Sequence, residues 1–349
     1  NMSLFDALQK QILYVMMAIM LIFVVHKVDY KIYMRLSYLF YFFFLCCTIA
    51  AYFVGVKLND TSRWIDLGFI TFQPSEGLKI GTIMVLARAM ESRQAIINDI
   101  KIIPTTLKIK SKEFKDVFFN NTLPLLSPVI LACGAILPAH TSSAAIVFLT
   151  SLIMLYIGRV HIKELFKFFA VVCIIGALGI GCLVLLDAGR INTAKKRVEK
   201  WTNEWVGETT AKNVNDISDT QRAMVAIKKG GLVGEGAGQS SSRVIVIHPE
   251  SDYAYAFFVS EYGIIAGLIL MLLYLWVFFR AMDIGQQCRT PFPTLMSLGL
   301  GLIITSQALL HILVQVNILP ETGQPLPFIS RGGSSLLFST LALGMIISV

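Results

Sequence analysis

Long apolar runs separated by polar breaks dominate the 349-residue chain. Several of these runs approach the roughly 20 residues that a helix needs to cross the hydrocarbon core of a bilayer. We therefore predict an all-α polytopic membrane protein with nine transmembrane helices, forming a single membrane domain over residues 1–349. The predicted spans lie at about 12–26, 36–56, 75–90, 118–137, 142–158, 164–187, 253–279, 294–317 and 331–349.

Lysine and arginine residues in the short loops predict the side of the membrane that each loop occupies, because cytoplasmic loops carry an excess of them. The basic breaks at 27–35, 88–117, 159–167 and 280–293 are therefore expected in the cytoplasm. The polar segment 188–252 is then expected outside, as one large extracytoplasmic loop.

Composition supports this class. The chain is 55% hydrophobic and 15% charged, whereas about 25% of residues are charged in soluble domains. The net charge of +8 is interpreted as a topology signal together with attraction to anionic membrane lipids. No basic stripe with interleaved aromatic residues occurs, so a nucleic-acid partner is not expected. None of the six cysteines lies in the outer loop, so no disulfide framework is indicated.

Asp252 stands where the polar outer loop ends and an apolar run begins. A carboxylate at a membrane boundary is costly to desolvate and is therefore a candidate functional residue. The stretch Gly230–Gly238 before it contains too many glycines for a regular helix. It is expected to form either a flexible lid or a loop whose N–H groups approach an anion.

The segment 59–79 is a second candidate region. Pro74 suits the first turn of a helix, and Glu76 near that N-terminus complements the helix dipole. Glu76 and Lys79 are three residues apart, so they share a helix face and can pair. The pair is compatible with a structural role and with a substrate role. Arg63 beside Trp64 suits either a head-group anchor or a pyrophosphate contact.

The segment 320–335 leads into the last apolar run. Ser330, Gly332, Gly333 and Ser334 indicate a tight helix start rich in donors, which could contact an anion or a sugar. The alternative is a re-entrant packing segment whose small residues fit between helices.

Several motifs together resemble the SEDS family (shape, elongation, division and sporulation), whose members include FtsW and RodA. Residues 63–68 match Arg-Trp-Ile-x-Leu-Gly, and residues 72–79 match Phe-Gln-Pro-Ser-Glu-x-x-Lys. Residues 234–240 match Gly-x-Gly-x-Gly-x-Ser, and the family's Asp before a Glu-x-Gly setting is matched by Asp252. Residues 322–335 match Thr-Gly-x-x-Leu-Pro-Phe-x-Ser-x-Gly-Gly-Ser-Ser. The resemblance covers nearly the whole chain.

The resemblance implies a peptidoglycan glycosyltransferase of the bacterial cytoplasmic (inner) membrane, with its active site on the extracytoplasmic face. Its substrate would be lipid II, a disaccharide-pentapeptide on undecaprenyl pyrophosphate, and its partner a class B penicillin-binding protein. Asp252 would be the catalytic residue. The substrate contacts carried over are Arg63, Trp64, Gln73, Glu76, Lys79, Gly236, Gly238, Ser240, Ser330, Gly332, Gly333 and Ser334.

The chain departs from the family pattern in several places. The family usually has ten transmembrane helices, and the first is missing here, as expected for a chain that begins with Asn1 and is trimmed. The usual Gln-Pro-Asp-x-Gly-Thr segment reads Leu137–Ser142, so its Asp is absent. His140 within it is expected to be a packed or interfacial histidine. Arg331 replaces a Tyr, and Ile329–Ser330 favours an FtsW-like chain.

The residues themselves permit this chemistry. A carboxylate at the outer boundary could act as a general base on an acceptor sugar hydroxyl, and we assign this role to Asp252. A divalent cation, Mg or Mn, could neutralise the leaving pyrophosphate, although the sequence shows no dedicated metal cluster. Two alternatives remain: a lipid II flippase, and a scaffold that activates a penicillin-binding protein without catalysis. The concentration of motifs on the outer face favours the polymerase.

Overall fold

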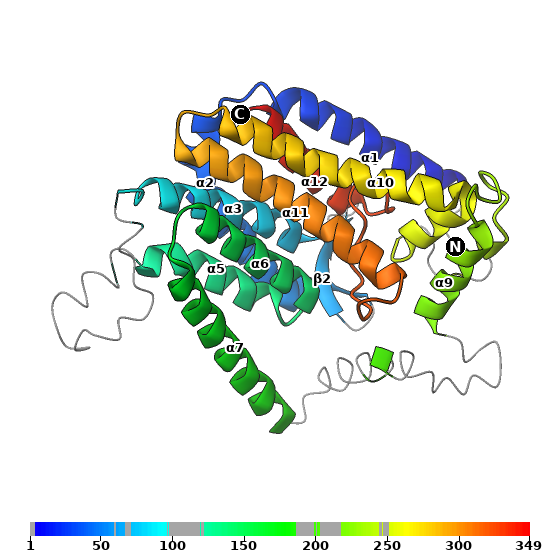
Figure 1. The fold of residues 1–349 in the computed structure, drawn as a ribbon, viewed down its shortest axis with the longest axis horizontal. Helices are drawn as coiled ribbons and strands as arrows, with labels where there is room; N and C mark the ends of the chain where they lie inside the picture. Colours follow the sequence, from blue (N-terminus) through cyan, green and yellow to red (C-terminus); the bar gives the residue numbers. More distant parts are fainter. Residues whose placement is uncertain are drawn as a thin grey trace. The chain divides into compact units, whose positions relative to one another are not determined.

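Helices dominate the computed structural model (Figure 1). It describes residues 4–58, 61–66, 71–95, 97, 119, 122–185, 199, 201–202, 218–243, 246 and 251–349. Most of the basic loop 88–117 and about half of the predicted outer loop 188–252 lie outside these residues. The main helices are α1 (Leu4–Val25), α2 (Tyr30–Val54), α3 (Pro74–Glu91), α5 (Leu123–Ile136), α6 (Thr141–Ile157), α7 (Ile162–Leu185), α9 (Asp219–Gly230), α10 (Ala254–Gln286), α11 (Pro291–Gln315) and α12 (Gly333–Ile347).

Every predicted apolar run overlaps one of these helices, and α9 is an additional helix within the predicted outer loop. Four described helical stretches are long and apolar enough to cross a bilayer: Leu8–Val25, α2, α10 and α11. Shorter apolar helices are α5, α6 and α12. The chain is therefore an integral membrane protein.

A three-stranded antiparallel sheet corrects the prediction of an all-α fold. Its strands are β1 (Val56–Leu58), β2 (Thr61–Asp66) and β3 (Thr71–Phe72), in the order β1-β2-β3. Threonine, isoleucine and the aromatic residues in this segment favour extended backbone. The strands are too short for an alternating pattern to stand out among the apolar runs, which is why sequence reasoning missed them.

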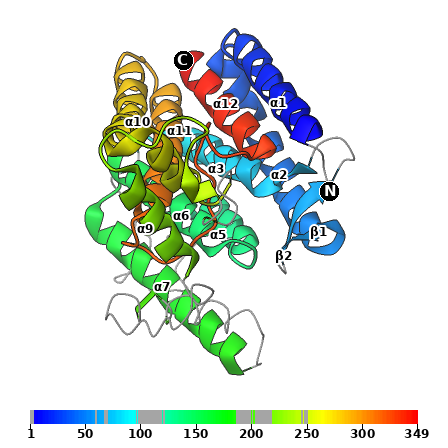
Figure 2. The same cartoon turned by 90° about the vertical axis from the view of Figure 1, so that its right-hand side faces the viewer.

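The chain forms two compact units. The first comprises Asn1–Leu165, Leu273–Gln307 and Pro327–Val349, and the second comprises Phe166–Leu272 and Ala308–Leu326. In the first unit, α2 packs along α3, and α1 packs along α12 (Figures 1 and 2). The first and last helices are thus neighbours and run parallel, with Gly333 beside Tyr14 and Gly344 beside Val25.

Small residues on α3 bring it close to α2. A Cβ on Gly77 would lie 2.4 Å from the ring of Phe44, and one on Gly81 would lie 3.0 Å from the Cα of Tyr41. Such close approach between helices is typical of membrane proteins. The hydroxyl of Tyr41 donates a 2.8 Å hydrogen bond to the carbonyl of Pro128, which ties α2 to α5.

In the second unit, α9 begins with a capping box formed by Ser218 and Gln221. Its Ala223 and Ala226 pack in one buried cluster with Tyr253 and Ala256 at the start of α10. This cluster sets α9 beside the residues that directly follow Asp252.

Candidate active site

Asp252 lies half-buried in the turn that leads into α10, as the prediction of a loop–helix junction required. Its main-chain carbonyl accepts a 2.6 Å hydrogen bond from Nε2 of Gln315, at the end of α11. The Oε1 atom of the same glutamine accepts from the N–H of Ala256 at 3.4 Å. The first N–H groups of a helix have no partner within it. Gln315 therefore supplies an acceptor to the first turn of α10 and holds Asp252 as well.

His311 supports the N–H group of the residue before Ala256. Its Nε2 atom lies 3.4 Å from the main-chain nitrogen of Tyr255, and its Nδ1 atom lies 2.7 Å from the carbonyl oxygen of Gln324. A carbonyl can only accept, and a main-chain N–H can only donate. These partners select the neutral imidazole with the proton on Nδ1.

Glu321 holds the residue next to Asp252. Its Oε1 atom accepts from the hydroxyl of Tyr253 at 2.9 Å and from that of Thr220 at 3.0 Å. Burial, and after it the nearby Glu321 carboxylate, raises the pKa of Tyr253. The phenol therefore stays protonated and donates to Glu321. The start of α10 is thus braced from α11, from α9 and from the segment that follows α11.

The glycine-rich stretch after α9 forms turns, which confirms that it is not a regular helix. It joins α10 at Gly263, whose φ of 84° interrupts the helix. In an uninterrupted helix, the N–H groups of Ile264 and Ile265 would bond to the carbonyls of Ser260 and Glu261. Here they bond to the carbonyls of Gly231 and Leu232 instead, at 2.9 and 3.4 Å.

The two α10 carbonyls that lose these partners accept hydrogen bonds from N–H groups of the loop. The N–H of Glu235 bonds to Ser260 O at 3.1 Å, and the N–H of Gly236 bonds to Glu261 O at 3.0 Å. The Glu261 carboxylate accepts from the N–H of Gly238 at 3.0 Å. The amides of Gly236 and Gly238 are thus engaged by the protein, so an anion could use them only after displacing Glu261. Ser240, also predicted as a substrate contact, is buried and shares a hydrogen bond with Ser260.

In the first unit, Glu76 and Lys79 form the predicted ion pair. The Nζ of Lys79 lies 2.8 Å from Oε2 of Glu76 and donates to Oε1 of Gln307 at 2.8 Å. Glu76 is 4% and Lys79 1% exposed. Pro74 occupies the first turn of α3 as predicted. Burial this deep supports the structural interpretation of the pair.

A small cavity of about 10 Å³ adjoins the pair, lined by Glu76, Lys79, Ile80, Ile303, Ile304, Gln307, Phe338, Ser339 and Ala342. The Oε1 atom of Glu76 is buried and accepts no hydrogen bond from the described part of the protein. A cavity of this size has room for about one water molecule, and one water would satisfy the second carboxylate oxygen.

The remaining predicted contacts of this unit lie around the starts of α3 and α12. Gln73 is buried and donates to the hydroxyl of Ser75 at 3.0 Å. Phe72 of β3 packs against Phe338 of α12. The sheet and the start of α12 are thereby brought together. Arg63 and Trp64 belong to β2, where Trp64 pairs with Val56; for Arg63 the structure describes the main chain.

The start of α12 is tight, as predicted. The N–H of Gly332 bonds to the carbonyl of Ser330 at 2.7 Å, and α12 begins at Gly333. Gly333 packs so closely on the ring of Tyr14 that a Cβ would lie 2.2 Å from it. Ser334 is buried, and its hydroxyl has no hydrogen-bond partner among the described residues. This arrangement fits both the packing and the ligand interpretation.

Sequence reasoning missed the three polar residues of α11. Gln307, His311 and Gln315 are all buried, and their spacing of four residues places them on one face of the helix. Gln307 holds Lys79, while His311 and Gln315 hold the start of α10. Their spacing within an apolar run was the available signal, because polar groups inside a membrane segment normally face protein.

His140 is a packed histidine, as predicted. It is buried at the start of α6, with its Nδ1 atom 3.0 Å from the hydroxyl of Ser142 and 3.2 Å from that of Ser143. Within the described ranges, no three His, Cys, Asp or Glu side chains are grouped where they could hold a metal ion. The described residues therefore offer no dedicated site for a divalent cation.

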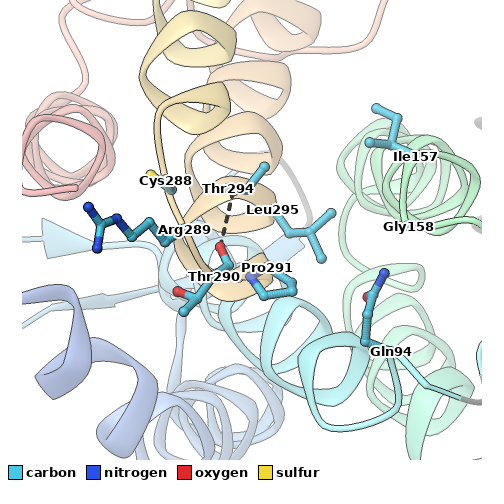
Figure 3. A pocket seen from close by; sticks show the side chains of 9 residues that line it. All are labelled: Gln94, Ile157, Gly158, Cys288, Arg289, Thr290, Pro291, Thr294 and Leu295. Atoms are coloured by element: carbon cyan, nitrogen blue, oxygen red, sulfur yellow. Dashed lines mark hydrogen bonds between the residues drawn. The ribbon is translucent and has the colours of Figure 1, made fainter.

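A larger cavity of about 260 Å³ lies elsewhere in the first unit (Figure 3). It contains no predicted site residue, and Figure 3 shows Arg289 directed away from Gln94. Its lining comes mainly from segments predicted to face the cytoplasm. The lining residues are Gln94, Ile157, Gly158, Cys288, Arg289, Thr290, Pro291, Thr294 and Leu295.

Comparisons with known proteins agree with the fold and the motifs. The probable peptidoglycan glycosyltransferase FtsW of Coxiella burnetii is 28% identical over 347 residues, which cover 97% of this chain and 85% of that protein. The stage V sporulation protein E of Bacillus subtilis is 26% identical, with 98% of this chain and 86% of that protein covered.

Solved structures give the same result for the fold. RodA of Thermus thermophilus matches with a TM-score of 0.64 at 19% identity, covering 98% of this chain and 86% of that chain. A chain from a structure on the coordination of polymerization and crosslinking by a peptidoglycan synthase complex matches with a TM-score of 0.70 at 18% identity, covering 98% and 89%. A family model described as "Cell cycle protein" matches residues 1–349. The chain therefore belongs to the FtsW, RodA and SpoVE family of cell cycle proteins.

Proposed function

We propose that this protein is a peptidoglycan glycosyltransferase that polymerises lipid II at the outer face of the bacterial cytoplasmic membrane. Family membership and the names of its FtsW relatives support the activity. The observation that best supports this site is that the turn of Asp252 is held in place. Gln315 bonds to the main-chain carbonyl of Asp252, and Glu321 bonds to the hydroxyl of the next residue, Tyr253.

In the proposed reaction, the Asp252 carboxylate accepts the proton of the acceptor sugar hydroxyl. The hydroxyl oxygen forms a bond to the anomeric carbon of the donor while the bond from that carbon to the pyrophosphate breaks. The leaving group is undecaprenyl pyrophosphate, and a single displacement inverts the anomeric centre. Holding the main chain of the base and of the helical turn that follows it limits its motion relative to the acceptor, which lowers the entropic part of the barrier.

The predicted substrate contacts are proposed for each unit by itself. Arg63, Trp64 and the start of α12 are candidates for the pyrophosphate and sugar. Glu76 and Lys79 are buried against Gln307, so we assign them to the stability of the first unit. Gly236 and Gly238 become available to an anion when Glu261 leaves them.

The topology and the partner are part of the same proposal. All nine apolar helices are taken to cross the membrane, with residues 188–252 outside, which is where the sugar of lipid II would be. The partner is proposed to be a class B penicillin-binding protein, which would crosslink the new glycan.

A lipid II flippase is the second candidate. The buried Glu76–Lys79–Gln307 group supports it, because charged groups inside a membrane often mark a transport path. A flippase would need no general base, so the fate of the Asp252→Asn variant separates the two.

The deciding experiment measures glycan chains formed from lipid II by the purified protein, with and without the penicillin-binding partner. Chain formation by the protein alone, or with a crosslinking-dead partner, supports the polymerase. No glycan under either condition, together with movement of labelled lipid II across vesicle membranes, supports the flippase. Glycan made by the partner alone, and merely increased by this protein, supports the scaffold.

A further inference from the structure

The exposed side chains of α10 show how deep this helix sits in the bilayer. Apolar residues at spacings of three and four are exposed from about a quarter of the way along it: Tyr262, Ile265, Leu268, Leu272, Trp276 and Phe279. Glu261 and Arg280 bracket this stripe, and no charged residue lies between them. Residues 262–279 span about 27 Å at 1.5 Å per residue, close to the thickness of a hydrocarbon core. Tyr262 and Trp276 are of the residue types that favour the two interfaces.

The first part of α10 therefore stands outside the hydrocarbon. The helix has 33 residues, so its length of about 50 Å exceeds a core of about 30 Å. The interruption at Gly263 falls at the boundary. Residues 254–261 continue from there to Asp252 in the aqueous region.

Helix α9 runs beside this outer part and towards the boundary. At its beginning, Thr220 and Tyr253 share Glu321 as their hydrogen-bond acceptor. At its end, Gly230 packs so closely against Val259 that a Cβ would lie 2.3 Å from that residue's carbonyl oxygen. The chain then bonds through Gly231 and Leu232 to Ile264 and Ile265. The turn after α9 is therefore held at the level where the lipid-facing stripe begins.

The side chains of this turn are apolar and exposed. Leu232 is 67% and Val233 79% exposed. Lys228, one turn earlier on α9, is also exposed. Water would surround both apolar side chains if the turn lay in the aqueous region. At the boundary they would meet acyl chains, while Lys228 would reach the anionic phosphates.

We propose that the turn Gly231–Val233 is a membrane anchor, with Leu232 and Val233 inserted among the lipid head groups and upper acyl chains. The anchor ties the outer loop to a fixed height and thereby fixes α9 and the turn of Asp252 above the bilayer. The inference rests on α10 crossing the membrane and does not depend on glycosyl transfer.

The test places an environment-sensitive fluorescent amino acid at position 233 of the full-length protein by codon suppression. The purified protein is put into nanodiscs of phosphatidylethanolamine and phosphatidylglycerol, with or without a doxyl-labelled lipid. Gln239, exposed in the same loop, supplies the matched control position. We expect blue-shifted emission that the doxyl lipid quenches at 233, and water-like, unquenched emission at 239.

Two results would overturn the anchor. One is water-like emission at 233 that the doxyl lipid leaves unchanged. The other is a blue shift that appears only after a penicillin-binding protein is added, which would make the turn a protein contact. A probe at position 232 repeats the measurement if the variant at 233 is unstable, as judged by its thermal unfolding beside the wild type. A protein without polymerase activity can still pass this test, so the two proposals fail separately.

Discussion

The side chain of Gln315 donates a 2.6 Å hydrogen bond to the main-chain carbonyl of Asp252, across 63 residues of sequence. With its other atom, the same amide accepts from the N–H of Ala256. One side chain thus spans the junction between the turn that carries the proposed base and the helix that follows. The position of Asp252 therefore depends on a residue that would not touch the substrate.

Replacing Gln315 by Met keeps the length of the side chain and removes both hydrogen bonds. We expect kcat to fall by about 10-fold or more, because small displacements of a catalytic group are costly, while KM for lipid II stays unchanged. Thr305→Val is the matched control. It removes a 3.0 Å bond from α11 to the carbonyl of Tyr274 on α10, away from Asp252, and should leave kcat near the wild-type value.

A double variant separates positioning from general damage. If Gln315 acts through Asp252, then Gln315→Met should cause no further loss of rate in an Asp252→Asn background. If the rate losses of Gln315→Met and Asp252→Asn multiply in the double variant, Gln315 acts independently of Asp252. If Gln315→Met lowers kcat no more than Thr305→Val does, Gln315 has no special role in positioning Asp252.

Asp252→Asn should abolish most of the activity and leave the fold intact. The amide keeps the size of the side chain but cannot take the proton, and the loss of a general base typically lowers rates by roughly 10²–10⁴-fold. Polymerisation, lipid II binding and thermal unfolding are measured on the same preparation. Polymerisation close to wild type by a folded variant would remove Asp252 from the mechanism.

Glu76 and Lys79 should be strongly coupled. Removing one buried charge leaves the other unpaired, which is expected to cost about 3–5 kcal/mol of stability. Glu76→Gln and Lys79→Met should each lower the unfolding temperature. The double variant should lower it by less than the sum of these two losses. The comparison is a double-mutant cycle on thermal unfolding in detergent. Additive effects would contradict the coupling.

Gly263→Ala should destabilise the second unit. Gly263 has a φ of 84°, and a Cβ there would lie 2.3 Å from the carbonyl oxygen of Leu232. The backbone conformation alone should cost about 1–3 kcal/mol. Gly134→Ala in α5 is the control, since a Cβ there meets nothing within 4 Å and alanine favours helix. Equal unfolding temperatures for the two variants would show that the loop does not depend on Gly263.

The predicted orientation can be checked by labelling single cysteines with a membrane-impermeant reagent in whole cells, in a background without native cysteines. A cysteine at position 213 should be labelled from outside, and one at position 108 should react only after the membrane is opened. The reverse pattern would place residues 188–252 in the cytoplasm and would remove Asp252 from the outer face.

Local rules predicted the parts of the fold that depend on nearby residues. The apolar runs predicted the helices because a spanning helix must be apolar over most of its length. The three-residue spacing of Glu76 and Lys79 predicted their contact. The strands were missed because two of them have three residues or fewer, and α9 was missed because its amphipathic pattern lies within a long polar loop.

Partners far apart in sequence could not be predicted in the same way. The spacing of Gln307, His311 and Gln315 identifies a buried face of α11 but does not indicate what that face meets. That Gln307 would reach Lys79, 228 residues away, follows from the packing of α3 against α11. Similarly, nothing in the glycine-rich motif indicated that Glu261 would occupy the N–H of Gly238.

The exchange of hydrogen bonds between the glycine-rich loop and α10 has a consequence for variation in chain length. Surface loops generally tolerate insertions. Here Gly231 and Leu232 accept from Ile264 and Ile265, while the loop amides at 235 and 236 occupy the carbonyls of residues 260 and 261. One extra residue between 232 and 235 would shift one set of bonds against the other and leave main-chain groups without partners. Over this stretch, the number of residues is as tightly constrained as it is inside a helix, although the segment has no regular secondary structure.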